Sequence, residues 1–233
     1  MQAGFVEILS TEFVSGWASD SELDPMLPVM VAKLGDEILG WSVCRFARRD
    51  LPAGAAFVIP FLRTIDKAQV SEVEVFHLRS MTPLKRGMAA RIEANPPLQV
   101  FVVGSPRSGT SQLGKCISEV FSLPWFGEGH GAPALGEAWR VIPHNLPANT
   151  FASVMAKLDL GGQILSLARE GYYFAHSSAS FLDKTPGIEM IHSIPMLQAA
   201  FPKAKIIFAK RNGVANVLSR MTKFGGKIRG ALQ

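Results

Sequence analysis

Apolar and polar positions alternate over short segments in the first third of the chain. These segments are rich in apolar and β-branched residues, and turns rich in Gly, Asp and Pro separate them. The expected strands cover residues 4–9, 13–18, 28–34, 37–45, 55–62 and 70–78. Strands this short, at this spacing, predict a small β-sandwich-like domain over residues 1–80.

The pattern changes after residue 80. Residues 81–96 predict a basic linker, and from residue 97 to 233 short apolar runs alternate with amphipathic ones. The expected elements there are strands at 98–103 and 205–209, and helices at 111–122, 151–169, 187–201 and 214–222, with a long loop before the second helix. Pro195 should interrupt the third helix. This order predicts an α/β domain, a P-loop-like parallel sheet flanked by helices, with its ligand at the carboxyl ends of the strands.

A glycine loop follows the expected strand 98–103. Residues 104–111 read GSPRSGTS, and an amphipathic segment comes next. A strand, a glycine loop and a helix in this order hold phosphate on backbone N–H groups and on the positive end of the helix. The GxxxxG frame is present, but Thr110 stands where a nucleoside triphosphate loop has lysine, and the nearest cation is Arg107. The loop therefore predicts binding of an anion other than a nucleoside triphosphate.

A second candidate phosphate site follows the expected strand 205–209. Arg211 lies just after this strand, and Ser219 follows eight residues later in an expected helix. An arginine at a strand end and a serine two helical turns further on can converge on one phosphate. Between the two sites, Lys184 stands at an expected helix entrance, two residues before Pro186.

Four segments together resemble the sulfotransferase family. Residues 105–111 (SPRSGTS) resemble its 5′-phosphosulfate loop, and residues 201–219 resemble its 3′-phosphate site. Residues 183–186 (DKTP) are similar to a family segment whose lysine faces the sulfuryl group. Residues 126–130 (FGEGH) resemble the Gly-Glu segment of the tyrosylprotein and related bacterial sulfotransferases, where the glutamate is the base. The resemblance covers roughly residues 97–224.

The resemblance implies a transferase that moves a sulfuryl group from 3′-phosphoadenosine 5′-phosphosulfate (PAPS) to a hydroxyl of a carbohydrate, tyrosyl or small-molecule acceptor. The residues implied to hold the donor are Ser105, Arg107, Ser108, Gly109, Thr110, Ser111, Arg211 and Ser219. The residues implied in catalysis are Glu128 as base, His130 as the alternative base, and Lys184 and Arg107 on the leaving phosphate. By residue type alone, Ser105 and Thr185 are turn or capping residues. No metal is expected, since there is no triphosphate chain to bridge and no aspartate after the strand 205–209.

The chain also departs from the family pattern. Asn212 stands where an aspartate usually follows the arginine, and the family domain normally continues past its 3′-phosphate helix, whereas the chain ends at Gln233. A truncated form without the part that closes over the adenine is therefore expected. Two alternatives stay open: a small-molecule kinase or other P-loop phosphotransferase, and a non-catalytic donor-binding protein. Residues 16–18, 29–35 and 48–51 resemble a small β-domain attached to bacterial glycosyl- and sulfotransferases.

Composition narrows the cellular setting. The net charge of +5 comes largely from eight lysines and arginines after residue 202, where no acidic residue occurs. Few aromatic residues lie among these charges, which favours a phosphate-rich small ligand and predicts no nucleic-acid partner. No apolar run reaches the ~20 residues of a membrane span, and the start of the chain is not a signal peptide. Cys44 and Cys116 fall in separate elements and are expected to be buried free thiols, which indicates a cytoplasmic protein.

Overall fold

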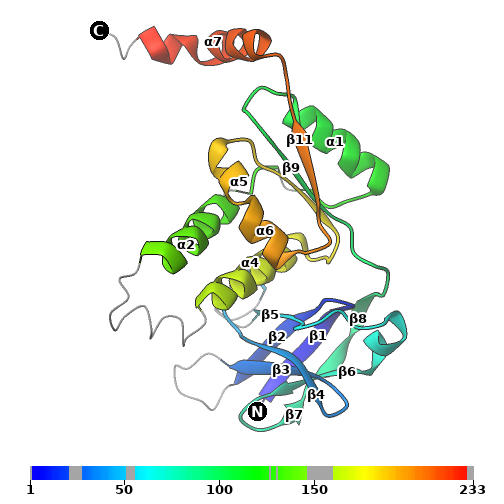
Figure 1. Cartoon of the computed structure of the whole chain (residues 1–233). Coiled ribbons are helices and arrows are strands. Elements are labelled where there is room, and N and C mark those ends of the chain that lie inside the picture. Colours follow the sequence, from blue (N-terminus) through cyan, green and yellow to red (C-terminus); the bar gives the residue numbers. More distant parts are fainter. Residues whose placement is uncertain are drawn as a thin grey trace. The chain divides into compact units, whose positions relative to one another are not determined.

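The computed structural model describes residues 2–20, 28–50, 56–125, 127–129, 131–145 and 160–229 (Figure 1). The chain divides into two compact units, Met1–Pro97 with Arg169–Ala179, and Leu98–Ala168 with Ser180–Gln233. The first unit is a small β-sandwich, and the second contains a parallel sheet flanked by helices. The α/β fold class predicted from the sequence is therefore confirmed.

Two four-stranded sheets form the first unit. One sheet has the order β5-β2-β1-β8 and consists of β1 (Gln2–Ser10), β2 (Phe13–Asp20), β5 (Ala56–Pro60) and β8 (Lys85–Glu93). The other has the order β4-β3-β6-β7 and consists of β3 (Val29–Leu34), β4 (Glu37–Val43), β6 (Val73–His77) and β7 (Thr82–Pro83). Five of the six expected strands appear nearly as predicted.

One apolar core joins the two sheets. Val6 and Val14 of the first sheet lie in the same buried cluster as Met30 and Leu39 of the second, with Ile59 of β5. Alternate residues of a strand point to the same side, so one face of each sheet supplies this core. The apolar residues that alternate in the sequence are the ones on this buried face.

Two expectations for the first unit are wrong. Residues Lys67–Glu72 form a 3-10 helix, η1, so the sixth expected strand begins only at Val73. The predicted linker 81–96 contains the strands β7 and β8, because β8 pairs in parallel with β1 along much of its length. The sequence of β8, KRGMAARIE, shows no alternation since most of its side chains are exposed or half-buried at the edge of the sheet.

The last part of α4 (Leu160–His176) belongs to the first unit. The buried ring of Tyr173 stacks on Phe13 with centroids 4.5 Å apart, and its hydroxyl donates a hydrogen bond of 2.8 Å to the carboxylate of Glu12. Arg169 donates to the carbonyl of Phe61 at 2.8 Å. These contacts satisfy polar groups that burial would otherwise leave without partners.

Three parallel strands form the sheet of the second unit. β9 (Gln99–Gly104) lies between β10 (Phe181–Lys184) and β11 (Lys205–Ala209). Lys184 pairs with Val102, and Ala209 pairs with Gly104, so the carboxyl ends of the strands lie at the same edge.

Helices cover both faces of this sheet (Figure 1). Val100 and Val102 of β9 pack in one cluster with Leu113 and Ile117 of α1 (Thr110–Phe121). Phe101, which points the other way, lies 5.8 Å from the ring of Phe201 at the end of α6. The strand is apolar at every position because both its faces are buried.

The helices of this unit differ in part from the prediction. Among the described residues, the helices are α1, α2 (Gly131–Asn145), the first part of α4, α5 (Ile188–His192), α6 (Ile194–Ala200) and α7 (Gly213–Arg229). The predicted long loop contains α2, and the predicted helix 187–201 is broken at Ser193, next to Pro195 as expected. The expected helix 151–169 is described only from Leu160, and residues 151–159 lie outside the described residues.

The Glu12–Tyr173 contact yields a stability prediction. Tyr173→Phe removes a buried hydroxyl that donates to a buried carboxylate, and we expect it to lower the free energy of unfolding by about 1–3 kcal/mol. Tyr172→Phe, the same change at the neighbouring and less buried position, is the matched control and should cost less. Urea unfolding at pH 7 measures both, and equal losses would contradict the role given to this hydrogen bond.

Candidate active site

Gly104 turns the chain out of β9 into the predicted phosphate loop. Its φ is +152°, and a Cβ atom there would lie 2.4 Å from the carbonyl oxygen of Ala209 in β11. Gly109, at the end of the loop, has a φ of +94°. Between them Arg107 adopts a φ of +71°, which costs an L-residue about 1–2 kcal/mol. Such strained backbone is concentrated at functional sites.

The loop leads directly into the first turn of α1. The backbone N–H and the hydroxyl of Ser108 both donate to the carbonyl of Ser105, at 3.1 and 2.6 Å, which closes the loop into a turn. Gly109 is the N-cap of α1, and no side chain caps this helix end. The first N–H groups of a helix have no intrahelical acceptor and carry its positive dipole end. The predicted ligands Thr110 and Ser111 stand at this end, so it fits an anion.

Hydrogen bonds link the predicted phosphate loop to the segment after β11 and to α7. Arg211 donates from Nη1 to the carbonyl of Arg107 at 3.2 Å, and Arg107 donates from Nε to the hydroxyl of Ser219 at 3.0 Å. Asn216 of α7 donates to the carbonyl of Pro106 at 3.0 Å. The two phosphate sites predicted separately are therefore adjacent. Asn216 was missed in the sequence, since an amide in an amphipathic helix carries no motif.

Asn212 has a local role at the start of α7. Its side-chain oxygen accepts a hydrogen bond of 3.2 Å from the backbone N–H of Ala215, as an N-cap residue does. Asparagine caps a helix about as well as aspartate. The departure from the family pattern at this position therefore keeps the cap and loses only the negative charge.

Lys184 and Glu128 form an ion pair beside the loop. Lys184 is the last residue of β10, and its Nζ lies 2.6 Å from Oε1 of Glu128. The lysine side chain is 4% exposed, whereas the glutamate is 41% exposed. A Cβ atom on Gly114 of α1 would lie 3.4 Å from Cβ of Lys184, so this glycine leaves room for the lysine stem. The expectation of a helix entrance at Lys184 is wrong, because α5 begins only at Ile188.

Thr185 and Asp183 hold the neighbouring Gly129. The N–H of Gly129 donates to the hydroxyl of Thr185 at 2.9 Å, and this hydroxyl lies 2.7 Å from Oδ1 of Asp183. A Cβ atom on Gly129 would lie 2.5 Å from Oδ2 of Asp183. The hydroxyl of Thr185 thus contacts the backbone of Gly129, which lies 56 residues earlier in the chain, and caps no described helix.

The structure brings most of the predicted residues to one edge of the sheet. The loop residues follow β9, Lys184 ends β10 and Arg211 follows β11. The backbone N–H of Gly187 donates to the carbonyl of Gly104 at 2.9 Å and ties the chain after β10 to the loop. Glu128 reaches the same region through Lys184. His130, the alternative base, lies outside the described residues.

Comparison with known proteins agrees with this geometry. The model of the sulfotransferase family matches residues 97–232, which is more than half of the chain. The chain belongs to the sulfotransferase family. The match covers the sheet β9–β11 with its loop, the Lys184–Glu128 pair and α7. The second unit is therefore a transferase domain of the kind that moves sulfuryl groups.

Two further comparisons accompany this sulfotransferase assignment. A crystal structure of an unliganded sugar kinase from Janibacter sp. HTCC2649 is 18% identical, over 55% of this chain and 68% of that one, with a TM-score of 0.33. No curated protein matches the chain.

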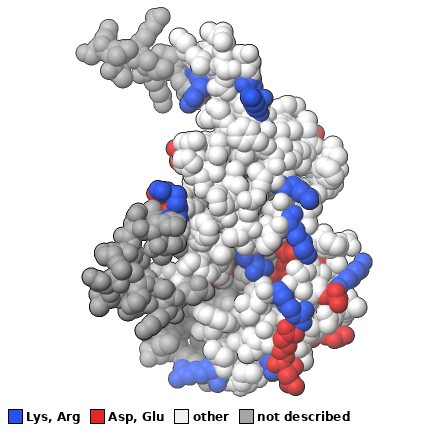
Figure 2. Space-filling view, viewed as in Figure 1, with Lys and Arg blue, Asp and Glu red and all other residues white. Residues whose placement is uncertain are grey.

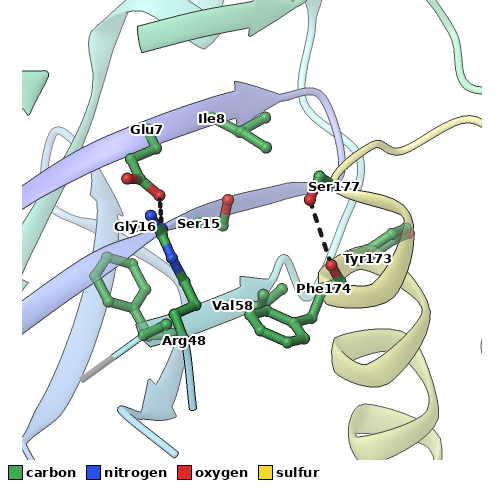
Figure 3. A pocket seen from close by; sticks show the side chains of 11 residues that line it. Glu7, Ile8, Ser15, Gly16, Arg48, Val58, Tyr173, Phe174 and Ser177 are labelled. Carbon is green, nitrogen blue, oxygen red and sulfur yellow. Dashed lines mark hydrogen bonds and ion pairs between the residues drawn. The ribbon is translucent and has the colours of Figure 1, made fainter. Parts of the chain in front are cut away.

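The N-terminal unit of this sulfotransferase-family chain contains a cavity of about 260 Å³ (Figure 3). It is lined by Glu7 and Ser15 of the sheet, and by Phe174 and Ser177 of α4 and the turn after it. Its cation, Arg48, is paired with Glu7 at 2.5 Å and with Asp50 at 2.6 Å. None of the residues predicted to hold the donor or to act in catalysis lines it.

The structure also describes the cysteines, the groups that could hold a metal ion, the lengths of the helices and the surface charges. Both cysteines are free, but only Cys44 is buried, so the expectation of a buried Cys116 is wrong. Burial raises the pKa of the Cys44 thiol to about 12. Among the described residues no group of three or more His, Cys, Asp or Glu could hold a metal ion, and no described helix is long and apolar enough to cross a membrane. Figure 2 shows blue and red side chains next to each other in the lower part of the view.

The two loop glycines give a graded prediction. Gly104→Ala would place a methyl group against the backbone of β11, whereas Gly109→Ala meets no atom within 4 Å and has only the strain of its φ. We expect Gly109→Ala to cost about 1–2 kcal/mol and Gly104→Ala distinctly more. Urea unfolding of the two variants measures the difference. Equal stability of the two variants would show that β9 and β11 separate easily at this point.

Proposed function

We propose that this protein transfers a sulfuryl group from PAPS to the hydroxyl of a carbohydrate, tyrosyl or small-molecule acceptor. Family membership supports sulfuryl transfer, and we propose PAPS as the donor and a hydroxyl as the acceptor in addition. The observation that carries it is the junction between the phosphate loop and α7. Arg107, Arg211 and Ser219 are linked there by two hydrogen bonds at the edge where three strands end.

A junction of this kind suits a ligand with two separate phosphates. The loop offers the N-terminal amides of α1 and Arg107 to one phosphate, and Arg211 with Ser219 offers a guanidinium and a hydroxyl to another. A guanidinium binds phosphate through forked, charge-assisted hydrogen bonds. PAPS carries a 5′-phosphosulfate and a 3′-phosphate on one nucleoside, so one molecule would bridge the junction and replace the Arg107–Ser219 hydrogen bond.

The Lys184–Glu128 pair supplies the two charges that the reaction needs. The acceptor oxygen forms a bond to sulfur while the bond from sulfur to the phosphate oxygen breaks, and adenosine 3′,5′-bisphosphate leaves. In the proposal, Lys184 and Arg107 stabilise the negative charge that grows on the phosphate oxygen. Glu128 takes the proton of the acceptor hydroxyl. The glutamate is the more exposed partner of the pair, which suits a group that an acceptor must reach.

Two other functions lead to different measurements. A small-molecule kinase would consume ATP with Mg²⁺, and Thr110 in the position of the phosphate-binding lysine argues against it. A donor-binding protein without activity would bind adenosine 3′,5′-bisphosphate and show no turnover of PAPS with any hydroxyl acceptor. We also propose that residues 1–80, together with the strand β8, act as an accessory domain of the transferase domain 97–233. The proposed location of the protein is the reducing cytoplasm.

The first prediction of this proposal concerns the donor site. Adenosine 3′,5′-bisphosphate should bind more tightly than AMP by about 1.5–3 kcal/mol, because Arg211 and Ser219 contact only the 3′-phosphate. Arg211→Ala should remove this difference. Arg107→Ala should weaken both ligands. Titration calorimetry of both ligands with the unmodified protein and with each variant measures these affinities.

Lys203→Ala is the matched control for Arg211→Ala. Lys203 is also an exposed cation next to β11, but it precedes the strand, whereas Arg211 follows it. The control should leave both affinities unchanged. Equal binding of AMP and the bisphosphate by the unmodified protein would remove the 3′-phosphate site from the proposal.

The second prediction concerns the base. Glu128→Gln keeps an oxygen that Lys184 can donate to but removes the group that takes the proton, so turnover should fall by about 10²–10⁴-fold. Glu119→Gln, an exposed glutamate paired with Lys115 on α1, should leave turnover unchanged. The measurement is the release of adenosine 3′,5′-bisphosphate from PAPS with a panel of hydroxyl acceptors. Turnover by the Glu128 variant at the unmodified rate would remove Glu128 as the base, and only a larger loss in His130→Ala would transfer this role to His130.

A further inference from the structure

The chain at the end of β10 carries three buried polar residues in a row. Asp183, Lys184 and Thr185 are all at most 3% exposed. In an extended chain, the first and third of three residues point to one side and the second to the other. Lys184 reaches Glu128, whereas Asp183 and Thr185 contact each other. Burying polar groups without partners is costly, and each of the three has one.

The hydroxyl of Thr185 has a fixed orientation. It accepts the hydrogen bond from the N–H of Gly129 at 2.9 Å, and its own proton has two acceptors in reach, Oδ1 of Asp183 at 2.7 Å and the carbonyl of Gly129 at 3.3 Å. The carboxylate is nearer and charged, so the proton points to Asp183. A chain of two hydrogen bonds therefore runs from the backbone of Gly129 through Thr185 to Asp183.

Gly129 is the residue after Glu128. Its backbone lies so close to Asp183 that a Cβ atom would come within 2.5 Å of the carboxylate. On the other side of Glu128, the indole N–H of Trp125 donates to the carbonyl of Gly127 at 3.0 Å. The backbone on both sides of the glutamate is thus held by side chains. Glu128 itself is partly exposed and has no such burial to fix it.

We propose that Asp183 and Thr185 are positioning residues for Glu128. They hold Gly129 against the end of β10, and so place the carboxylate of Glu128 beside Lys184 and towards the acceptor. This inference rests on the proposed function, in which Glu128 is the base. Reacting groups must be placed within fractions of an ångström, and a misplacement of about 1 Å can cost 10²-fold in rate.

The test uses two changes at Thr185 in the full chain. Thr185→Val keeps the size and the branch at Cβ but removes the hydroxyl, whereas Thr185→Ser keeps the hydroxyl. We expect Thr185→Val to lower kcat for PAPS turnover by about 10–100-fold, with KM for PAPS within about twofold. Thr185→Ser should restore kcat to within about threefold. Thr222→Val, a threonine whose hydroxyl bonds within α7, is the matched control and should change neither.

Asp183 is tested by its coupling to Thr185. Asp183→Asn should also lower kcat, and the variant with both Asp183→Asn and Thr185→Val should be hardly slower than the slower single variant, since the two side chains act as one unit. Effects that multiply would overturn the proposal. So would a Thr185→Val variant with unchanged kcat, or one whose loss the serine does not restore.

A second measurement does not depend on turnover. Exchange of the Gly129 N–H with deuterium should be at least tenfold faster in Thr185→Val than in Thr185→Ser, with adenosine 3′,5′-bisphosphate bound in both. Equal exchange would overturn the proposal even if no acceptor is found. Failure of the bisphosphate to bind the unmodified protein would instead overturn the proposed function, so the two failures are distinguishable.

Discussion

The candidate site depends on the parallel pairing of β10 and β11 with β9. Parallel strands end at the same edge, so three segments that are far apart in the sequence deliver their next residues to one place. Glycine at position 104 allows β9 and β11 to approach this closely, because a Cβ atom there would clash with the carbonyl oxygen of Ala209. The parallel pairing therefore places the predicted phosphate loop, Lys184 and Arg211 at one edge of the sheet. Hydrogen bonds such as that from Arg211 to the carbonyl of Arg107 then fix the loop relative to the segment after β11.

Charge burial is the second organising feature of the site. Asp183 and Lys184 are adjacent in the sequence and both buried, a placement whose desolvation is repaid only by close partners. Lys184 contacts Glu128 in the short segment before α2. Asp183 accepts a hydrogen bond from Thr185, whose hydroxyl in turn holds Gly129 of that segment. Buried polar groups that are fully partnered specify one arrangement of the chain. The segment Gly127–Gly129 is in this way held against the end of β10.

Several elements could not be predicted because their stability comes from distant contacts. β8 has no alternation of apolar and polar residues, and its backbone is fixed by pairing with β1. α2 contains glycines and prolines that indicate a loop, yet Gly136 lies where a Cβ atom would be 2.3 Å from the hydroxyl of Ser193. Glycine is required there for close packing of helices. The sequence therefore predicted a loop, because the contact between Gly136 and Ser193 exists only in the folded chain.

The sequence by itself determined what depends on neighbours along the chain. Most strands of the first unit appear in the alternation of apolar and polar residues, and the turn 104–109 with Arg107 appears in the spacing of its two glycines. The tertiary structure decided which groups meet. Glu128 and Lys184 are 56 residues apart, as are Gly129 and Thr185, and Arg107 lies 112 residues before Ser219. No local pattern encodes such pairs, because they arise from the register of parallel strands and from the burial of charge.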